Sequence, residues 1–140
     1  AAMGADAMLV IVRILDDEPL QSLLALALGV GLETLVEIHD EADAKRIVDL
    51  APPLVGINNR DLAHFQTDTD RAARIAALLP RGTAVVAASG IHGEPDIQRT
   101  LAAGIRRFLV GETLVRTDDP AALLKQWTAL PVPAILNSEP

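Results

Sequence analysis

The chain has 140 residues, of which 50% are hydrophobic, so it is long enough for one domain with an apolar core and is not expected to be disordered or fibrous. Its formal net charge of −7 repels phosphodiester backbones and anionic membrane surfaces, so we expect neither nucleic acid nor a membrane as a partner. The sequence has no cysteine, which excludes disulfides, thiolate zinc sites and cysteine nucleophiles and is compatible with a cytoplasmic location.

Short apolar runs alternate along the chain with longer Ala- and Leu-rich segments of helical periodicity, a pattern typical of repeated βα units. In chain order, the predicted strands are 7–14, 34–39, 54–58, 84–88 and 107–110. The predicted helices are 18–28, 40–50, 68–79, 95–103 and 120–127. Each helix opens on acidic residues or proline, which suit a first helical turn.

The predicted strands are continuously apolar rather than alternating, which indicates a parallel sheet buried by helices. A complete eight-stranded parallel barrel needs about 200–250 residues, whereas five βα units fill this chain. The sequence therefore predicts an α/β domain over residues 1–130, either a small open sheet or part of a barrel. Residues 131–140, PVPAILNSEP, have no periodicity and are predicted to be a C-terminal extension.

Polar residues at the carboxyl ends of the strands are the candidate site, because ligands of parallel α/β proteins gather there. Glu37 and His39 end the second strand, and alternation puts both on one face. A carboxylate inside an apolar run is costly to bury without a partner, so Glu37 is a candidate acid or base. The alternative is a structural ion pair with Arg13 or Arg60.

Asn58 and Arg60 follow on the third strand, two residues apart, and an amide beside a guanidinium suits a planar carboxylate or a phosphate. The alternative there is a solvated turn with Asn in the left-handed conformation.

Glycines close the fourth and fifth strands, as Ser89-Gly90 and Gly111-Glu112, where backbone N–H groups can approach a phosphate. His64 and His92 have no partner at metal-ligand spacing, so we interpret both as surface residues and expect no metal.

Five segments in this order, GADAMLVIVRIL, LVEIHDEADA, VGINNRDLAHFQTD, ASGIH and LVGETLVRTDDP, closely resemble the carboxyl-terminal portion of the indole-3-glycerol-phosphate synthase family. The resemblance covers roughly residues 1–128, and GINNRDL is its most specific part. It implies a (β/α)8 barrel of the TIM type, of which this chain would hold the fourth through eighth strands. It also implies a carbon–carbon lyase of tryptophan biosynthesis, which acts without a cofactor on 1-(2-carboxyphenylamino)-1-deoxyribulose 5-phosphate by ring closure, decarboxylation and dehydration.

The resemblance also implies roles for the strand-end residues. Glu37 would be the catalytic glutamate that transfers protons, and Asn58 would act with it in the catalytic set. Asn58 and Arg60 would hold the anthranilate end of the substrate, with the Arg facing its carboxylate. The phosphate would bind at Ser89, Gly90 and Gly111, with Glu112 at an adjacent position where the family varies between Ser and Glu.

Two departures from the family pattern bear on activity. Ala88 stands where the family usually has Glu before Ser-Gly, and a methyl group can neither accept a proton nor hydrogen-bond a hydroxyl. The family's first three strands, which bring a catalytic Lys, another Glu and a phosphate-contacting Lys, are not among the 140 residues. Each lost acid or base typically costs a factor of about 10²–10⁴, so we expect the chain alone to be poorly active.

Three interpretations follow. The first is a truncated synthase whose site is completed by a complementing N-terminal half. The second is a non-catalytic partial barrel that self-associates and still binds a phosphate or carboxylate, which Ala88 favours. The third is a small doubly wound domain of the flavodoxin type. A five-strand slice would expose two parallel edges, so we expect a homo-oligomer or a complementing partner in addition to a phosphorylated small molecule.

Overall fold

The computed structural model describes residues 4–58 and 69–133 of the chain. Five strands form one sheet in the order β1-β2-β3-β4-β5, and every neighbouring pair is parallel. The strands are β1 (Ala7–Ile11), β2 (Glu33–Ile38), β3 (Leu54–Asn58), β4 (Ala84–Ala88) and β5 (Arg107–Leu109). The α-helices are α1 (Asp17–Gly29), α2 (Glu41–Ile47), α3 (Thr69–Leu78), α4 (Glu94–Ala102), α5 (Glu112–Arg116) and α6 (Pro120–Thr128), and a 3-10 helix, η1 (Val12–Ile14), follows β1.

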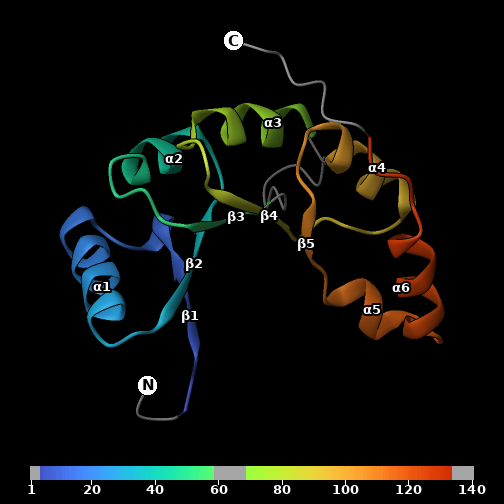
Figure 1. Cartoon of the computed structure of the whole chain (residues 1–140), viewed down its shortest axis with the longest axis horizontal. Coiled ribbons are helices and arrows are strands. Elements are labelled where there is room, and N and C mark those ends of the chain that lie inside the picture. Colours follow the sequence, from blue (N-terminus) through green and yellow to red (C-terminus); the bar gives the residue numbers. More distant parts are fainter. Residues whose placement is uncertain (1–3, 59–68, 134–140) are drawn as a thin grey trace.

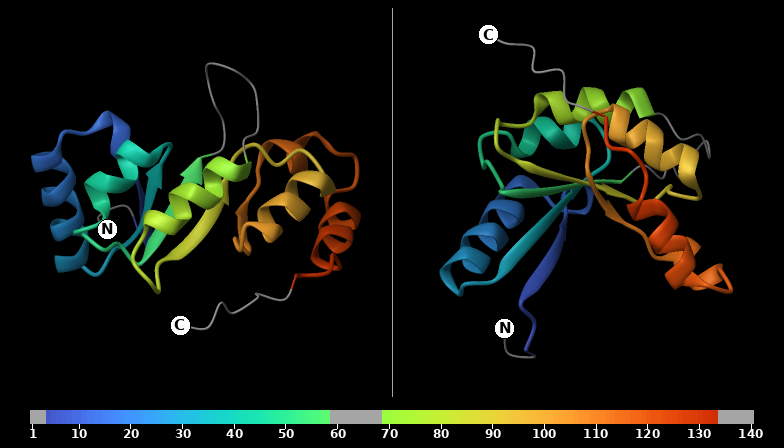
Figure 2. Two further views of the ribbon diagram at one scale, coloured as in Figure 1. Left: turned by 90° about the horizontal axis from the view of Figure 1, so that it is seen from above. Right: turned by 45° about the vertical axis from the view of Figure 1, so that its right-hand side comes forward.

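The strands lie side by side in chain order, and the helices run along the outside of the arch that the sheet forms (Figure 1). Figure 2 shows the same arrangement from above and turned so that the right-hand side of Figure 1 comes forward. A flavodoxin-type domain has the strand order 2-1-3-4-5 and helices on both faces, so the structure excludes that interpretation. The predicted fold class, parallel βα units of a TIM barrel with five strands in this chain, is confirmed.

The apolar core lies between the sheet and the helices. Alternate strand residues point into it, among them Val10, Val36, Ile38, Val55 and Ile57. They pack against Leu20 of α1, Ile47 of α2 and Ile75 of α3. A second cluster joins Ile97 and Leu101 of α4 to Trp127 of α6. The strands, rich in branched aliphatic residues, and the helices, rich in Ala and Leu, thus form two layers that pack against each other.

The other strand residues line the inner face of the sheet. Leu9 and Leu109 lie on the two edge strands, and each is 51% exposed. Between them, Leu35 covers Gly56, where a Cβ would lie 3.4 Å from Leu35 Cδ1, so the glycine makes room for the leucine. The inner face therefore carries an exposed leucine on each edge strand and a packed Leu35–Gly56 contact between them.

Two of the predicted elements differ from the structure. The predicted strand 7–14 is wrong beyond Ile11, because Val12–Ile14 turn into η1. Arg46 of α2 stabilises that turn, donating to Val12 O at 2.9 Å and to Leu15 O at 2.6 Å. The short helix α5 was not predicted, and the predicted helix 40–50 ends at Ile47.

Within residues 4–58 and 69–133, no helix has the length and hydropathy needed to span a bilayer.

The core assignment predicts different costs for the same substitution at two positions of one helix. Leu20 of α1 is 1% exposed, and Leu28 of the same helix is 83% exposed. We expect Leu20→Ala to lower the free energy of unfolding by about 2–5 kcal/mol, because it removes buried methyl groups and leaves a cavity. Leu28→Ala should change it by no more than about 0.5 kcal/mol. Urea unfolding of both variants checks this, and equal losses would contradict the placement of α1.

Candidate functional site

The candidate site lies at the carboxyl edge of the sheet, on its inner face. Glu37 stands opposite Gly56 of β3, and Asn58 stands opposite Ala88 of β4. Side chains two residues apart in a strand share a face, so Glu37, Asn58 and Ala88 all lie on the face opposite the helix layer. They come from three adjacent strands, and Asn58 and Ala88 lie one step closer to the carboxyl edge than Glu37.

The structure brings Glu37 and Asn58 together, because Asn58 Nδ2 donates a hydrogen bond to Glu37 Oε1 at 3.1 Å. The Glu37 side chain is only 13% exposed, and His39 Nε2 lies 3.5 Å from the same oxygen. Arg13 instead pairs with Asp40 at 3.0 Å, so the alternative of a structural ion pair between Glu37 and Arg13 is not observed. Arg60, the other expected partner and substrate ligand, lies outside the described residues.

The His39 side chain is buried and lies next to the Glu37 carboxylate. Its imidazole Nδ1 lies 3.7 Å from Asp43 Oδ2, and its backbone N–H donates to that same oxygen at 2.9 Å. Burial lowers the pKa of His39 from its ordinary value, and the Arg13 guanidinium lowers it further. The carboxylates of Glu37, Asp43 and Asp40 oppose this and raise the pKa, but burial prevails. His39 is therefore neutral at neutral pH and carries one ring N–H.

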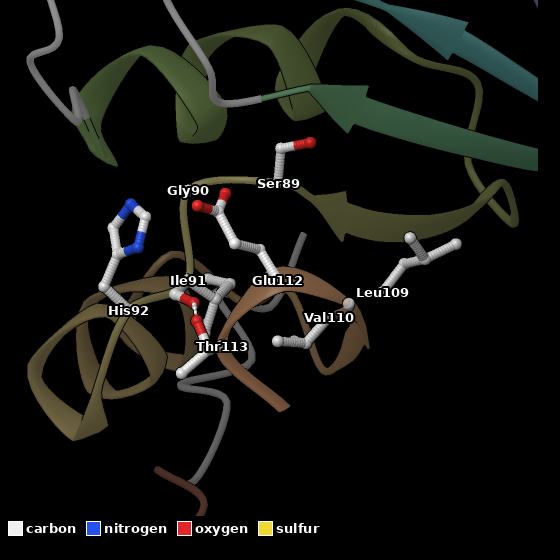
Figure 3. Close-up of a pocket in the computed structure, with 9 residues that line it drawn as sticks. Ser89, Gly90, Ile91, His92, Leu109, Val110, Glu112 and Thr113 are labelled. Carbon is white, nitrogen blue, oxygen red and sulfur yellow. Dashed lines mark hydrogen bonds between the residues drawn. The ribbon is translucent and has the colours of Figure 1, made fainter. Parts of the chain in front are cut away.

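A pocket of about 220 Å³ lies between the turn that follows β4 and the turn that follows β5 (Figure 3). It is lined by Ser89, Gly90, Ile91, His92, Leu109, Val110, Gly111, Glu112 and Thr113. Figure 3 shows the Thr113 hydroxyl donating to Ile91 O, at 2.6 Å, which ties the two turns together. All of the predicted phosphate residues thus line one cavity.

The backbone of this pocket is strained where it follows β4. Ser89 has φ +65° and Gly90 has φ +72°, two consecutive residues in the left-handed region. Such a conformation is uncommon for a non-glycine residue and is concentrated at ligand sites.

The negative charge of Glu112 in the same pocket is partly balanced by Arg116, whose Nη2 lies 3.1 Å from Glu112 Oε1, one helical turn away.

The sequence analysis gave no role to Asp43. It interpreted His92 as a surface residue, and the His92 side chain is exposed. A repeat could have pointed to Asp43 and to the pocket position of His92, because Ile-His-x-Glu-x-Asp occurs at 38–43 and again at 91–96. In both copies the His backbone N–H donates to the Asp carboxylate four residues later, at 2.9 Å. The imidazoles differ, because that of His39 is buried whereas His92 is exposed at the pocket.

Among the residues that the structure describes, no group of three or more His, Cys, Asp or Glu side chains is arranged to hold a metal ion.

The fold and the strand-end site together define part of a (β/α)8-barrel protein. A solved structure agrees: the chain is similar to the crystal structure of orotidine 5'-phosphate decarboxylase from Pyrococcus horikoshii OT3, with a TM-score of 0.66 and 16% sequence identity. The match covers 90% of this chain and 61% of that one. At this identity the likeness shows the fold alone.

The sequence comparisons are more specific. The family model for indole-3-glycerol phosphate synthase matches residues 1–127, so the chain belongs to the indole-3-glycerol phosphate synthase family. It is 51% identical over 126 residues to the indole-3-glycerol phosphate synthase of Desulfosudis oleivorans, covering 90% of this chain and 48% of that protein. It is 44% identical over 124 residues to that of Acidithiobacillus ferrooxidans, covering 89% and 47%. The chain spans about half the length of the curated relatives it matches.

The lowered pKa of His39 predicts a pH dependence of stability. The unfolded chain, with an ordinary His pKa of about 6.5, binds a proton that the folded chain resists. Stability should therefore be lost as the pH falls from above 6.5 toward the lower pKa of the folded state. We expect His39→Asn to lose less stability than the unsubstituted chain between pH 7.5 and pH 5. His92→Asn, at an exposed position, should retain the full loss, and urea unfolding at both pH values compares the three proteins.

Proposed function

We propose that this chain supplies the carboxyl-terminal half of the active site of an indole-3-glycerol-phosphate synthase, acting in the cytoplasm on 1-(2-carboxyphenylamino)-1-deoxyribulose 5-phosphate. One observation supports this most directly. The Glu37 carboxylate, hydrogen-bonded to Asn58, lies on the inner face at the carboxyl edge of the sheet, and the Ser89–Thr113 pocket opens at the same edge.

Ring closure followed by loss of CO₂ and of water requires protons to be given to and taken from the substrate. Glu37 fits this task, because its polar side-chain contacts among the described residues are to Asn58 and His39, both through Oε1. The second carboxylate oxygen can then face the substrate. Asn58 fixes the carboxylate and lies beside the position of the anthranilate ring.

The phosphate end of the substrate would bind in the pocket at Ser89, Gly90 and Gly111, beside the Glu112–Arg116 pair. Backbone N–H groups of glycine-containing turns are common phosphate ligands. Arg60 would face the substrate carboxylate, as the family resemblance implies.

Ala88 limits what the chain does alone. It is buried and stands next to Asn58 on the inner face, where the family's Glu would reach the substrate. The lysines that the resemblance assigns to the first three strands are also not among the 140 residues. We therefore propose that turnover requires a complementing N-terminal half.

The second candidate is a non-catalytic partial barrel that self-associates and binds phosphate. Ala88 favours it, and so do the exposed side chains of Leu9 and Leu109 on the two edge strands, which a second copy could cover.

Complementation tests the proposed function. The N-terminal half of the Desulfosudis oleivorans relative is joined ahead of Ala1, and formation of indole-3-glycerol phosphate is followed by indole fluorescence. We expect no measurable turnover from the 140-residue chain, slow turnover from the fusion, and a gain of about 10²–10⁴-fold on adding Ala88→Glu, since a positioned acid or base contributes that much. Glu37→Gln should remove this gain.

Leu28→Ala, on the outer side of α1, is the control and should leave turnover unchanged. A folded fusion with Ala88→Glu that binds substrate without turnover would contradict the synthase proposal. If the 140-residue chain also forms a defined dimer by light scattering and binds inorganic phosphate, the second candidate takes its place.

A further inference from the structure

His39 and Glu37, at the end of β2, belong to a cluster of polar and charged side chains that also includes residues of β3, α2 and η1. His39 Nε2 and Asn58 Nδ2 both lie against Oε1 of Glu37, at 3.5 Å and 3.1 Å. The two groups approach from different sides, one from the end of β2 and the other from the end of β3. Together they can hold the carboxylate in one orientation.

Asp43 of α2 lies beside the imidazole. Its Oδ2 accepts the His39 backbone N–H at 2.9 Å and lies 3.7 Å from His39 Nδ1, which is longer than a hydrogen bond. Asp40 fixes Asp43 by accepting its backbone N–H at 2.9 Å as the N-cap of α2.

Arg13 of η1 contacts the carboxylates of both Asp40 and Asp43. Its Nη2 lies 3.0 Å from Asp40 Oδ2, and its Nε lies 3.7 Å from Asp43 Oδ2. The side chains of His39 and Asp43 are each only 8% exposed and that of Glu37 is 13% exposed, whereas Arg13 and Asp40 are 39% and 41% exposed, so the solvent screens the outer part of the cluster more than the inner part.

We propose that His39 is a positioning residue for Glu37, and that Asp43 and Arg13 hold its imidazole in place. The proposal rests on the proposed function for the catalytic use of Glu37. The repeat of Ile-His-x-Glu-x-Asp shows why the position is distinctive. His92 has the same backbone contact to Asp96, but its exposed side chain lies at the other pocket, so the backbone motif alone does not require a buried imidazole.

The first measurement needs no turnover. The three histidines of the 140-residue chain are titrated by NMR through their imidazole signals and assigned from His→Gln variants. The carboxylates of Glu37, Asp43 and Asp40 raise the pKa of His39, and the Arg13 guanidinium lowers it. Glu37→Gln and Asp43→Asn should therefore each lower the pKa of His39 further, whereas Arg13→Gln should raise it.

The matched control is His92, whose titration should be the same in Glu37→Gln as in the unsubstituted chain. Asp43→Asn removes a buried contact, so Glu37→Gln, which keeps the shape of the side chain, is the decisive variant. A His39 titration that is unchanged in a folded Glu37→Gln chain would overturn the proposal.

The second measurement separates positioning from packing, using the fusion that carries Ala88→Glu. His39→Phe should lower kcat by up to about 100-fold with little change in KM, since small misplacements of a catalytic group cost about that much. His39→Gln, which keeps an N–H donor, should recover part of the loss. A His39→Phe fusion with unchanged kcat would also overturn the proposal. A fusion with no turnover at all would count against the synthase function, and the titration would then decide the role of His39.

Discussion

The rest of this structure depends on one constraint, which is that the helical connections between parallel strands all take the same handedness. When every strand adds to the same edge and every helix returns over the same face, the strands stay in chain order and their carboxyl ends meet at one edge. The strand period of two then assigns each residue to a side. Val36 and Ile38 enter the core under the helices, while Leu35 and Glu37 face inward. A slip of one residue in β2 would exchange these sets, which would bury Glu37 under α2 and expose two core residues.

That constraint forces a carboxylate into a poorly solvated position, and the neighbouring elements make the position tolerable. Glu37 would be costly to bury without partners. Asn58 supplies a hydrogen-bond donor from the next strand, and His39 supplies a polar contact from its own. Asp40, the N-cap of α2, accepts the backbone N–H of Asp43, and Asp43 in turn accepts the backbone N–H of His39. The first turn of α2 therefore also fixes the end of β2. Folding and placement of the candidate catalytic group thus use the same contacts.

The sequence predicted the strand-ordered parallel fold, and it placed Glu37 and His39 on one face, because strand alternation and helix periodicity are local patterns. It did not predict η1, since that turn is held by Arg46, more than thirty residues away in the chain. Nor did it predict α5, whose five residues are too short for a periodicity to be recognised. The link from His39 to Asp43 was readable from the repeat at 38–43 and 91–96, but only the structure shows that one imidazole is buried and the other exposed.

Ala88 places an uncharged side chain beside Asn58, the hydrogen-bond partner of Glu37. Gly56 and Ala88 are adjacent small residues on the inner face, and a Cβ on Gly56 would lie 3.8 Å from that of Ala88. A carboxylate at position 88 would stand beside Asn58, whose amide already donates to Glu37, so a second buried carboxylate would need a cation. The methyl group of Ala88 adds no second charge beside the Glu37–Asn58 hydrogen bond.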